Sequence, residues 1–236
     1  MVGDRDPALP LLTLHTGAGG AHGQARVELS GATTANWVAK TANLLVDSLG
    51  SPERVGLLLP LHWQPVCLLL AGVATGATVV VARTPDDLAG CQAVFTTVEH
   101  AEAALDAGAD DVLALSCHPL GARLPAVPAL VSDYAVEVPG HGDHWGGGRA
   151  PGSVERDGAP VAVPAADLGP ADRLLCGVPL REVGWVLAAL RAGAAVVLAP
   201  DATTLDLPSL CASERVTATA GVDVDGLRRL DVPSSP

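Results

Sequence analysis

The stretch "RVGLLLPLHWQPVCLLLAGVATGATVVVAR", residues 54–83, decides the fold class, because it holds no formal charge between its two terminal arginines. Its length would suffice for a membrane-spanning helix, which needs about 20 apolar residues. Pro60 and Pro65 argue against such a helix, since proline lacks the amide proton that a continuous helix requires. Gly76 is a stop signal, and the β-branched "TVVV" that follows is typical of a strand. The stretch therefore predicts a strand, a helix and a second strand.

A second copy of this pattern lies at residues 172–201, "DRLLCGVPLREVGWVLAALRAGAAVVLAPD". The order is again arginine, apolar strand, proline, apolar helix, glycine and a valine-rich strand. This helix also carries Arg181, Glu182 and Arg191, which a bilayer core does not readily accept. Parallel strands that are covered on both faces are apolar throughout. The two copies predict an α/β fold of mostly parallel sheets with covering helices, and no membrane association.

The remaining elements follow from shorter patterns. The runs "PLLTLHT" and "ARVELS" predict a β-hairpin over residues 10–30, followed by a helix to about residue 49. Further helices are expected near residues 130–138 and 207–214, and at "DGLRRL", residues 225–230.

The turn-forming residues suggest a division into subdomains. We expect a first α/β subdomain with the hairpin at 1–138, and an irregular linker or mobile loop at 139–170, where glycine and proline are frequent. A second α/β subdomain is expected at 171–230 and a tail at 231–236.

Charge and cysteine usage narrow the functional class. The chain has 26 acidic and 14 basic residues, a net charge of -12, which disfavours nucleic acid and anionic membranes as partners. Its five cysteines form no CxxC pair, and the N-terminus lacks the pattern of a signal peptide. We expect a cytoplasmic protein. Lys40 is the single lysine available to any lysine-dependent mechanism.

The order of elements resembles a known superfamily. "ELSGATTANWVAKTANLLVDSLGSPERVGLLLPLHWQPVCLLLAGVATGATVV" is similar to the opening of adenylate-forming (AMP-binding) enzymes, which include acyl-CoA synthetases. "LCGVPLREVGWVLAALRAGAAVVLAPD", with the later "ERVTATAGV", is similar to a segment further along the same enzymes, so the resemblance covers about residues 26–222. "ANWVAKTANLL" and "GDHW" suggest a short actinobacterial-type family related to the N-terminal domain of those enzymes. The resemblance implies the fold of a truncated N-terminal domain.

The chain departs from the superfamily where chemistry is expected. The superfamily binds ATP phosphates on a loop of the form "TSGTTGxPKG" between the two repeats, and here that interval reads "HGDHWGGGRAPGSVERDG", without threonine or lysine. Glu182 replaces the pocket histidine, and Lys40 belongs to the first helix. The later nucleotide motifs and the C-terminal lid with its catalytic lysine are not found within these 236 residues. No catalytic or cofactor-binding residue is therefore assigned, and whether the protein is an enzyme stays open.

The most polar cluster is "HGDHW". His141, Asp143 and His144 are residue types that bind zinc or similar ions. Three ligands within four residues require the chain to fold back sharply, so a loop anchored by Trp145 is the preferred interpretation. We assign no metal site.

Residues at the strand ends are the other candidates. His62 and Trp63 follow the first strand of one repeat, and Glu182 and Trp185 that of the other, at the end where open α/β sheets bind ligands. Core packing or helix capping is the preferred role for these four residues.

Nucleophilic and nucleotide-hydrolysing motifs are not found. Cys117 and His118 are neighbours, and neighbours on a strand point to opposite faces. The sequence contains neither GxSxG nor GxxxxGK[ST].

Three hypotheses remain. The favoured one is a non-catalytic pseudoenzyme, or a specialised member, that binds a small acyl or nucleotide-like ligand or a protein partner at its strand ends. The second is an active adenylate-forming ligase that needs a partner chain, and the third is a structural subunit that buries "VLAALRAGAAVVLAP" against another chain.

Overall fold

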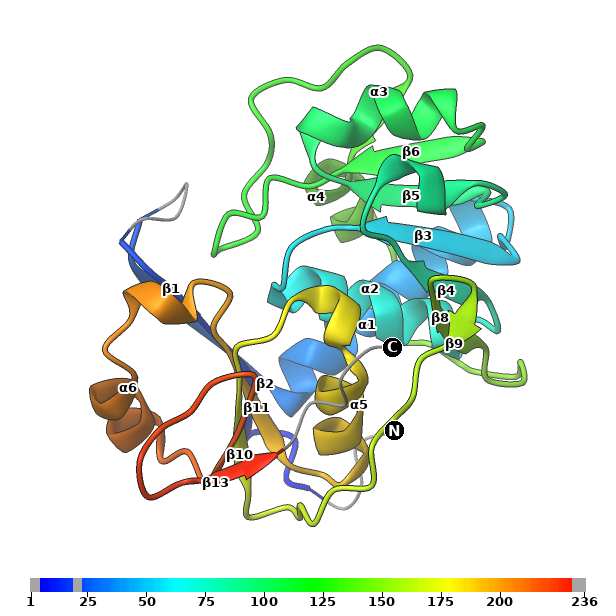
Figure 1. The fold of residues 1–236 in the computed structure, drawn as a ribbon. Helices are drawn as coiled ribbons and strands as arrows, with labels where there is room; N and C mark the ends of the chain where they lie inside the picture. The colour runs from blue at the N-terminus through cyan, green and yellow to red at the C-terminus, as the bar shows by residue number, and fades with distance from the viewer. Residues whose placement is uncertain (1–4, 19–22, 231–236) are drawn as a thin grey trace. The chain divides into compact units, whose positions relative to one another are not determined.

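The computed structural model describes residues 5–18 and 23–230 and confirms the predicted α/β class of mostly parallel sheets with covering helices (Figure 1). The chain forms two compact units. The first consists of Met1–Thr34, Leu61–Trp63 and Ala162–Pro236, and the second of Ala35–Pro60 and Gln64–Val161.

The second unit contains a seven-stranded sheet in the order β7-β6-β5-β3-β4-β8-β9, in which only the β8–β9 pair is antiparallel. Its strands are β3 (Arg54–Leu58), β4 (Thr78–Val81), β5 (Ala93–Thr96), β6 (Asp111–Ala114), β7 (Val131–Asp133), β8 (Ser153–Arg156) and β9 (Ala159–Pro160). The helical segments of this part of the chain are α1 (Gly31–Asn43), η1 (Leu44–Ser48), α2 (Trp63–Ala74), η2 (Pro85–Leu88), α3 (Val98–Asp106), α4 (Tyr134–Glu137) and η3 (Val138–Gly140).

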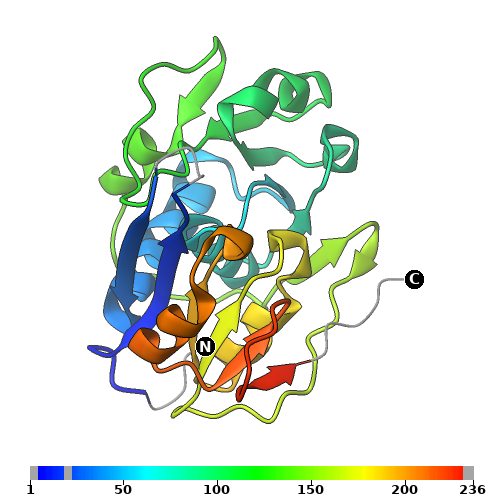
Figure 2. The ribbon, with the colours of Figure 1, turned by 60° about the vertical axis from the view of Figure 1, so that its left-hand side comes forward.

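The first unit contains a six-stranded sheet in the order β13-β12-β10-β11-β1-β2, in which only the β1–β2 pair is antiparallel (Figure 2). Its strands are β1 (Pro10–Thr16), β2 (Ala25–Ser30), β10 (Arg173–Cys176), β11 (Ala195–Leu198), β12 (Ala218–Ala220) and β13 (Arg228–Leu230). Its helical segments are η4 (Leu180–Glu182), α5 (Gly184–Arg191), η5 (Ala202–Thr204) and α6 (Leu207–Glu214).

The sequence repeat is also a structural repeat. β3, α2 and β4 form one parallel crossover, and β10, α5 and β11 form the other. The strand that follows each crossover, β5 or β12, pairs with the opposite side of the crossover's first strand, β3 or β10. The local orders are therefore β4-β3-β5 and β11-β10-β12. Each sheet therefore reverses its direction of winding once, and such a reversal is where open α/β sheets usually bind ligands.

The charge-poor stretches form strands that are buried on both faces. Val55 and Leu57 of β3 are fully buried, and every residue of β11 is buried. Burying a Val or Leu side chain contributes about 1.5–3 kcal/mol to stability, so these strands are the centres of their cores. Within the described residues, no helix combines the length and the apolar character that crossing a membrane would need.

Two sequence-based expectations about the subdomains differ from the contacts in the structure. The hairpin at residues 10–30 forms, but β1 pairs with β11, so the hairpin extends the sheet of the C-terminal half. The interval 139–170 is also not wholly irregular, because β8 pairs in parallel with β4. Both differences arise from strand pairing across long stretches of chain, which local residue patterns do not encode. The expected tail, 231–236, lies outside the described residues.

Two of the expected helices are corrected. Residues 228–230 form strand β13, which pairs with β12, and Gly226 breaks the local chain with a φ of 79°. Near residues 130–138 the chain first forms the edge strand β7 and only then the single turn of α4. The predicted helix at 207–214 is confirmed as α6.

Thr219 of β12 places a hydroxyl group in an apolar environment. Its side chain is fully buried, and its Oγ1 has no hydrogen-bond partner among the described residues. A buried hydroxyl without a partner costs about 1–3 kcal/mol. We expect Thr219→Val to raise the free energy of unfolding by about 1 kcal/mol in urea denaturation. Thr13→Val is the matched control and should lower it, because the Thr13 hydroxyl accepts a hydrogen bond from Arg173 Nη2 at 2.7 Å.

Candidate functional site

The residues predicted at the strand ends are mostly buried. His62 and Trp63, at the start of α2, are 2% and 3% exposed, and their ring centroids lie 5.4 Å apart. Trp185, in the first turn of α5, is also buried, whereas Glu182 in η4 is partly exposed. The structure thus places three of the four candidates inside the protein.

The "HGDHW" segment is held in place by hydrogen bonds to its backbone carbonyl oxygens. Asn43 Nδ2 donates hydrogen bonds to the carbonyl oxygens of Gly142 (2.8 Å) and His144 (3.0 Å). Lys40 Nζ donates to the carbonyl oxygens of Pro139 and His141. The one lysine of the chain therefore anchors this loop to α1, a role that the sequence did not indicate.

His141, Asp143 and His144 do not converge on one point. His141 Nε2 lies 3.4 Å from Ser48 Oγ, and Asp143 and His144 are exposed. Nowhere in the described part of the chain do three or more His, Cys, Asp or Glu side chains form a group that could hold a metal ion.

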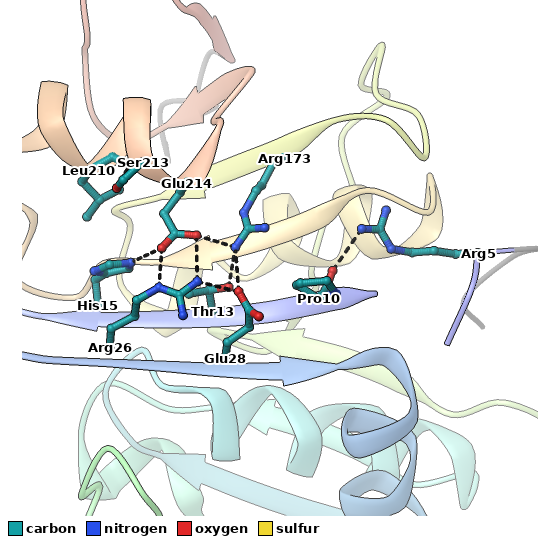
Figure 3. A network of polar contacts seen from close by, with 10 residues as sticks. All are labelled: Arg5, Pro10, Thr13, His15, Arg26, Glu28, Arg173, Leu210, Ser213 and Glu214. Carbon is teal, nitrogen blue, oxygen red and sulfur yellow. Dashed lines mark hydrogen bonds and ion pairs between the residues drawn. The ribbon is translucent and has the colours of Figure 1, made fainter. Parts of the chain in front are cut away.

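A polar network in the first unit centres on the buried carboxylate of Glu214 (Figure 3). Glu214, the last residue of α6, is 5% exposed and points toward the sheet. Its Oε1 accepts hydrogen bonds from Arg26 Nε (2.6 Å) and His15 Nε2 (2.8 Å). Its Oε2 accepts one from Arg173 Nη2 (2.6 Å) and a longer one from Arg26 Nη2 (3.3 Å). One carboxylate thus connects α6 to three strands, β1, β2 and β10.

The alternation of side chains along the strands explains the convergence. Successive side chains of a strand point to opposite faces, and residues paired across strands share a face. His15 pairs with Arg26, and Thr13 pairs with both Glu28 of β2 and Val197 of β11. Together with Arg173 of β10 they lie on the sheet face that α6 covers, so the network joins the hairpin to the rest of its unit.

Glu214 is held in its ionised form. Burial of the carboxyl group, the largest single effect, would raise its pKa, but the hydrogen bonds from Arg26 and His15 and the charges of Arg173 and Arg26 outweigh burial and lower the pKa. The hydrogen bond to Glu214 in turn raises the pKa of Arg26. A carboxylate that accepts four hydrogen bonds and does not protonate near neutral pH is an anchor and not a general acid.

The cysteines are unsuited to nucleophilic catalysis. Burial raises the pKa of Cys67, Cys176 and Cys117 to about 12, and the neighbouring Glu99 carboxylate contributes at Cys117. Because the thiolate is the reactive form, these thiols are unreactive near neutral pH.

The winding reversal of the first unit is filled by its own side chains. Gly177 follows β10, and a Cβ atom added to it would lie 2.4 Å from Val222 Cγ1. Gly221 follows β12, and a Cβ atom added to it would lie 2.2 Å from Val178 Cγ1. These glycines let the two valines pack closely against the strand ends.

The winding reversal of the second unit, between β3 and β5, carries polar groups. Thr96 Oγ1 donates to the Leu58 carbonyl at 3.2 Å, and Thr97 precedes α3. Glu99 lies in the first turn of α3, where interactions with the Thr97 hydroxyl and with its own backbone N–H lower the pKa of its carboxyl group. An internal anion thus occupies the N-terminus of α3.

The β8–β9 hairpin lies at the other side of this sheet. It closes through a two-residue turn, Asp157–Gly158, with φ values of 52° and 74°. Two successive positive φ values define the tight turn that Asp-Gly favours. Asp157 also forms an ion pair with Arg83 at 3.2 Å.

The sequence analysis missed the Glu214 network. Thr13 and His15 are two residues apart, as are Arg26 and Glu28, so the sequence indicated a polar face on each strand of the hairpin. This pattern was equally compatible with a face that is exposed to solvent. Only the pairing of β1 with β11 brings α6 and Arg173 over that face.

Comparison with solved structures identifies the fold. The chain is similar to a Brucella canis acyl-CoA synthetase (TM-score 0.70, 16% identity) over 92% of this chain and 45% of that one. It is also similar to a Mycobacterium tuberculosis fatty acyl CoA synthetase (0.62, 20%, over 91% and 46%). The N-terminal domain of FACL13 from the same organism matches with a TM-score of 0.61 and 18% identity over 91% and 59%. The chain thus has the fold of the N-terminal part of acyl-CoA synthetases and spans about half the length of the first two structures.

Sequence comparison gives a relative of similar size. No family model matches the chain. A Mycobacterium tuberculosis protein described as "TIGR03089 family protein" is 37% identical over 227 residues, which cover 90% of this chain and 91% of that protein. At this identity and coverage, the chain belongs to the TIGR03089 family.

Proposed function

We propose that this chain is a small-ligand-binding protein that retains the N-terminal scaffold of acyl-CoA synthetases but does not form acyl adenylates. The ligand we infer is an acyl group, bound at the carboxyl ends of β3 and β5 in the second unit. The proposal rests on three features of the described residues.

The turn between β8 and β9 is the observation that carries the proposal. In the superfamily that the sequence resembles, a glycine- and threonine-rich phosphate loop lies between the two repeats. Such a loop works because several successive backbone N–H groups converge on phosphate oxygens. Here the two-residue Asp157–Gly158 turn presents few amides, and the next N–H beyond β9, that of Val161, donates to the Val154 carbonyl at 2.8 Å.

The N-terminus of α3 supports the same conclusion. A helix N-terminus at a strand end commonly binds phosphate, because its N–H groups are unpaired and its dipole favours negative charge. Glu99 supplies that negative charge from within the chain. A ligand at this edge of the sheet would therefore present a neutral group, as an acyl chain does.

The location follows from the contrast between the two sheets. Val178 and Val222 fill the winding reversal of the first unit, whereas Thr96 and Thr97 mark the reversal of the second. This contrast favours the second unit as the site.

A thermal-shift comparison tests the proposal. We expect a medium-chain acyl-CoA to raise the melting temperature more than free CoA, because the acyl group carries the recognition, and we expect ATP and AMP to have no effect. A ligand at one hundred times its dissociation constant stabilises the native state by about 2.7 kcal/mol, which is readily measured. Glu99→Gln removes the internal anion and should make inorganic phosphate stabilising where it has no effect on the wild type. Equal shifts with acyl-CoA and ATP would contradict the proposal.

A further inference from the structure

Exposed apolar side chains are concentrated in one stretch of the second unit's chain. Six large hydrophobic residues are exposed among the described residues, and four of them, Leu120, Val127, Leu130 and Val136, lie within 17 residues of chain around β7. Leu130 is 88% exposed and Leu120 is 74% exposed. Large apolar side chains scattered singly over a surface need no explanation, but a group of them often marks an interaction site.

Leu130 is held outward by a backbone conformation that leucine rarely adopts. Its φ is 65°, in the left-handed region that favours glycine. The following residue, Val131, is buried and donates its N–H to the Pro128 carbonyl at 3.3 Å, so a turn fixes Leu130 immediately before the strand. Residues held in sparsely populated backbone conformations cluster at active sites, ligand clamps and switch regions.

β7 is the edge strand of the seven-stranded sheet. It pairs with β6, and no strand of the described chain pairs with its other side. The Asp133 carboxylate accepts hydrogen bonds from the N–H groups of Leu124 and Ala135, both at 2.8 Å. The charge of Asp133 is therefore satisfied internally, and the strand edge can accept another extended chain by β-augmentation.

The surroundings of this edge are acidic. Residues 84–130 contain one basic residue, the exposed Arg123, and seven acidic residues, which are Asp86, Asp87, Glu99, Glu102, Asp106, Asp110 and Asp111. Glu102 and Asp106 are exposed on α3, Asp110 is exposed in the loop that follows, and none of these three forms an ion pair with the described residues. α3 packs on β6, the strand beside β7.

We propose that β7, with Leu120 and Leu130, binds an extended segment of a partner protein in which apolar residues alternate with lysine or arginine. Alternation gives a strand one apolar and one basic face, which matches the exposed leucines and the unpaired carboxylates of α3. A second copy of this chain is the less favourable occupant, because each copy carries a net charge of -12 and the same acidic residues.

Fluorescence anisotropy with labelled nonapeptides tests this proposal on the full chain. We expect a peptide of alternating valine and lysine to bind, and its affinity to fall at least threefold between 0.05 and 0.3 M salt because the charge attraction is screened. A peptide of alternating valine and glutamate should not bind. Hydrogen exchange of Ser132 and Asp133 should slow in the presence of the lysine peptide, since β-augmentation protects edge amides, whereas the Val131 N–H is already bonded to the Pro128 carbonyl.

Two variants and two matched controls locate the surface. Leu130→Gly removes the exposed side chain without opposing the local φ, and it should weaken binding of the lysine peptide about tenfold. Glu102→Lys should weaken it about threefold. Leu9→Gly and Asp47→Lys alter an exposed leucine and an exposed carboxylate elsewhere and should have no effect.

Three results would overturn the proposal. The first is no binding of the lysine peptide at millimolar concentration, and the second is equal binding of the two peptides. The third is a concentration-dependent dimer in analytical ultracentrifugation that Leu130→Asp abolishes, since this would identify a second copy as the occupant.

Discussion

Glu214→Ala is expected to lower the free energy of unfolding by about 3 kcal/mol, because removing one partner of a buried ion pair leaves the others without compensation. Glu214 connects α6 to β1, β2 and β10, and its side chain is 4% exposed. The Arg173 side chain, 17% exposed, would lose its closer carboxylate partner and keep only the partly exposed Glu28 at 3.5 Å. Urea denaturation at pH 7 measures the loss.

Glu28→Ala is the matched control, since Glu28 contacts the same two arginines but is 31% exposed. We expect a loss below about 1 kcal/mol, as for other solvent-exposed ion pairs. A double variant, Glu214→Leu with Arg173→Leu, should recover part of the stability lost in Glu214→Ala, because it removes both charges together. Equal losses in Glu214→Ala and Glu28→Ala would contradict the central role of Glu214.

The pH dependence follows from the sign of the pKa shift. The pKa of Glu214 is lower in the folded state than the ordinary value for glutamate, so the stabilisation is complete above about pH 5 and is lost as the pH falls through the folded pKa. Between pH 5 and pH 3 the wild type should therefore lose more stability than Glu214→Ala. Identical acid slopes would mean that the Glu214 carboxyl has the same pKa in the folded and unfolded states.

Gly152→Ala is the second change with a large expected effect. A Cβ atom at this position would lie 1.9 Å from the carbonyl oxygen of Ala77 and 2.7 Å from its carbonyl carbon. These are backbone atoms, which cannot move aside as a side chain does. The Gly152 N–H also donates to the Val73 carbonyl at 2.8 Å, which fixes the entry of β8 beside β4. We expect a loss of about 3 kcal/mol, at the upper end for overpacking, and faster hydrogen exchange in residues 153–161.

Gly146→Ala is the control for this substitution. Gly146 lies in the same loop, its φ is outside the left-handed region, and a Cβ atom added there would have no neighbouring atom within 4 Å. Its stability should be unchanged or slightly higher, since alanine restricts the unfolded chain more than glycine. If Gly152→Ala were as stable as Gly146→Ala, the close packing of β8 against β4 would be wrong.

The sequence predicted the elements that depend on local patterns. The two charge-poor stretches have a proline, a glycine and a β-branched run at matching places, and these features predicted β3-α2-β4 and β10-α5-β11 as structural equivalents. The hairpin at residues 10–30 and the helix at 207–214 were predicted for the same reason, because alternation and capping are written in neighbouring residues.

The features that the sequence did not predict depend on pairing between distant parts of the chain. No pattern in residues 10–16 indicates that β1 pairs with β11 some 180 residues later, so the hairpin was placed with the wrong neighbours. The short strand β13 depends on pairing with β12 and was taken for a helix. The Glu214 network shares this cause, because its members come from four elements that meet only after the six-stranded sheet has formed.

ATP–pyrophosphate exchange by the purified chain, with a panel of short-, medium- and long-chain carboxylic acids, tests the central claim most directly. Adenylation is reversible and moves labelled pyrophosphate into ATP, whereas a protein that only binds an acyl group leaves the label where it started. Our account predicts no exchange above the level without protein, even with acids whose CoA esters raise the melting temperature. Robust acid-dependent exchange would contradict it and would support an active adenylate-forming ligase.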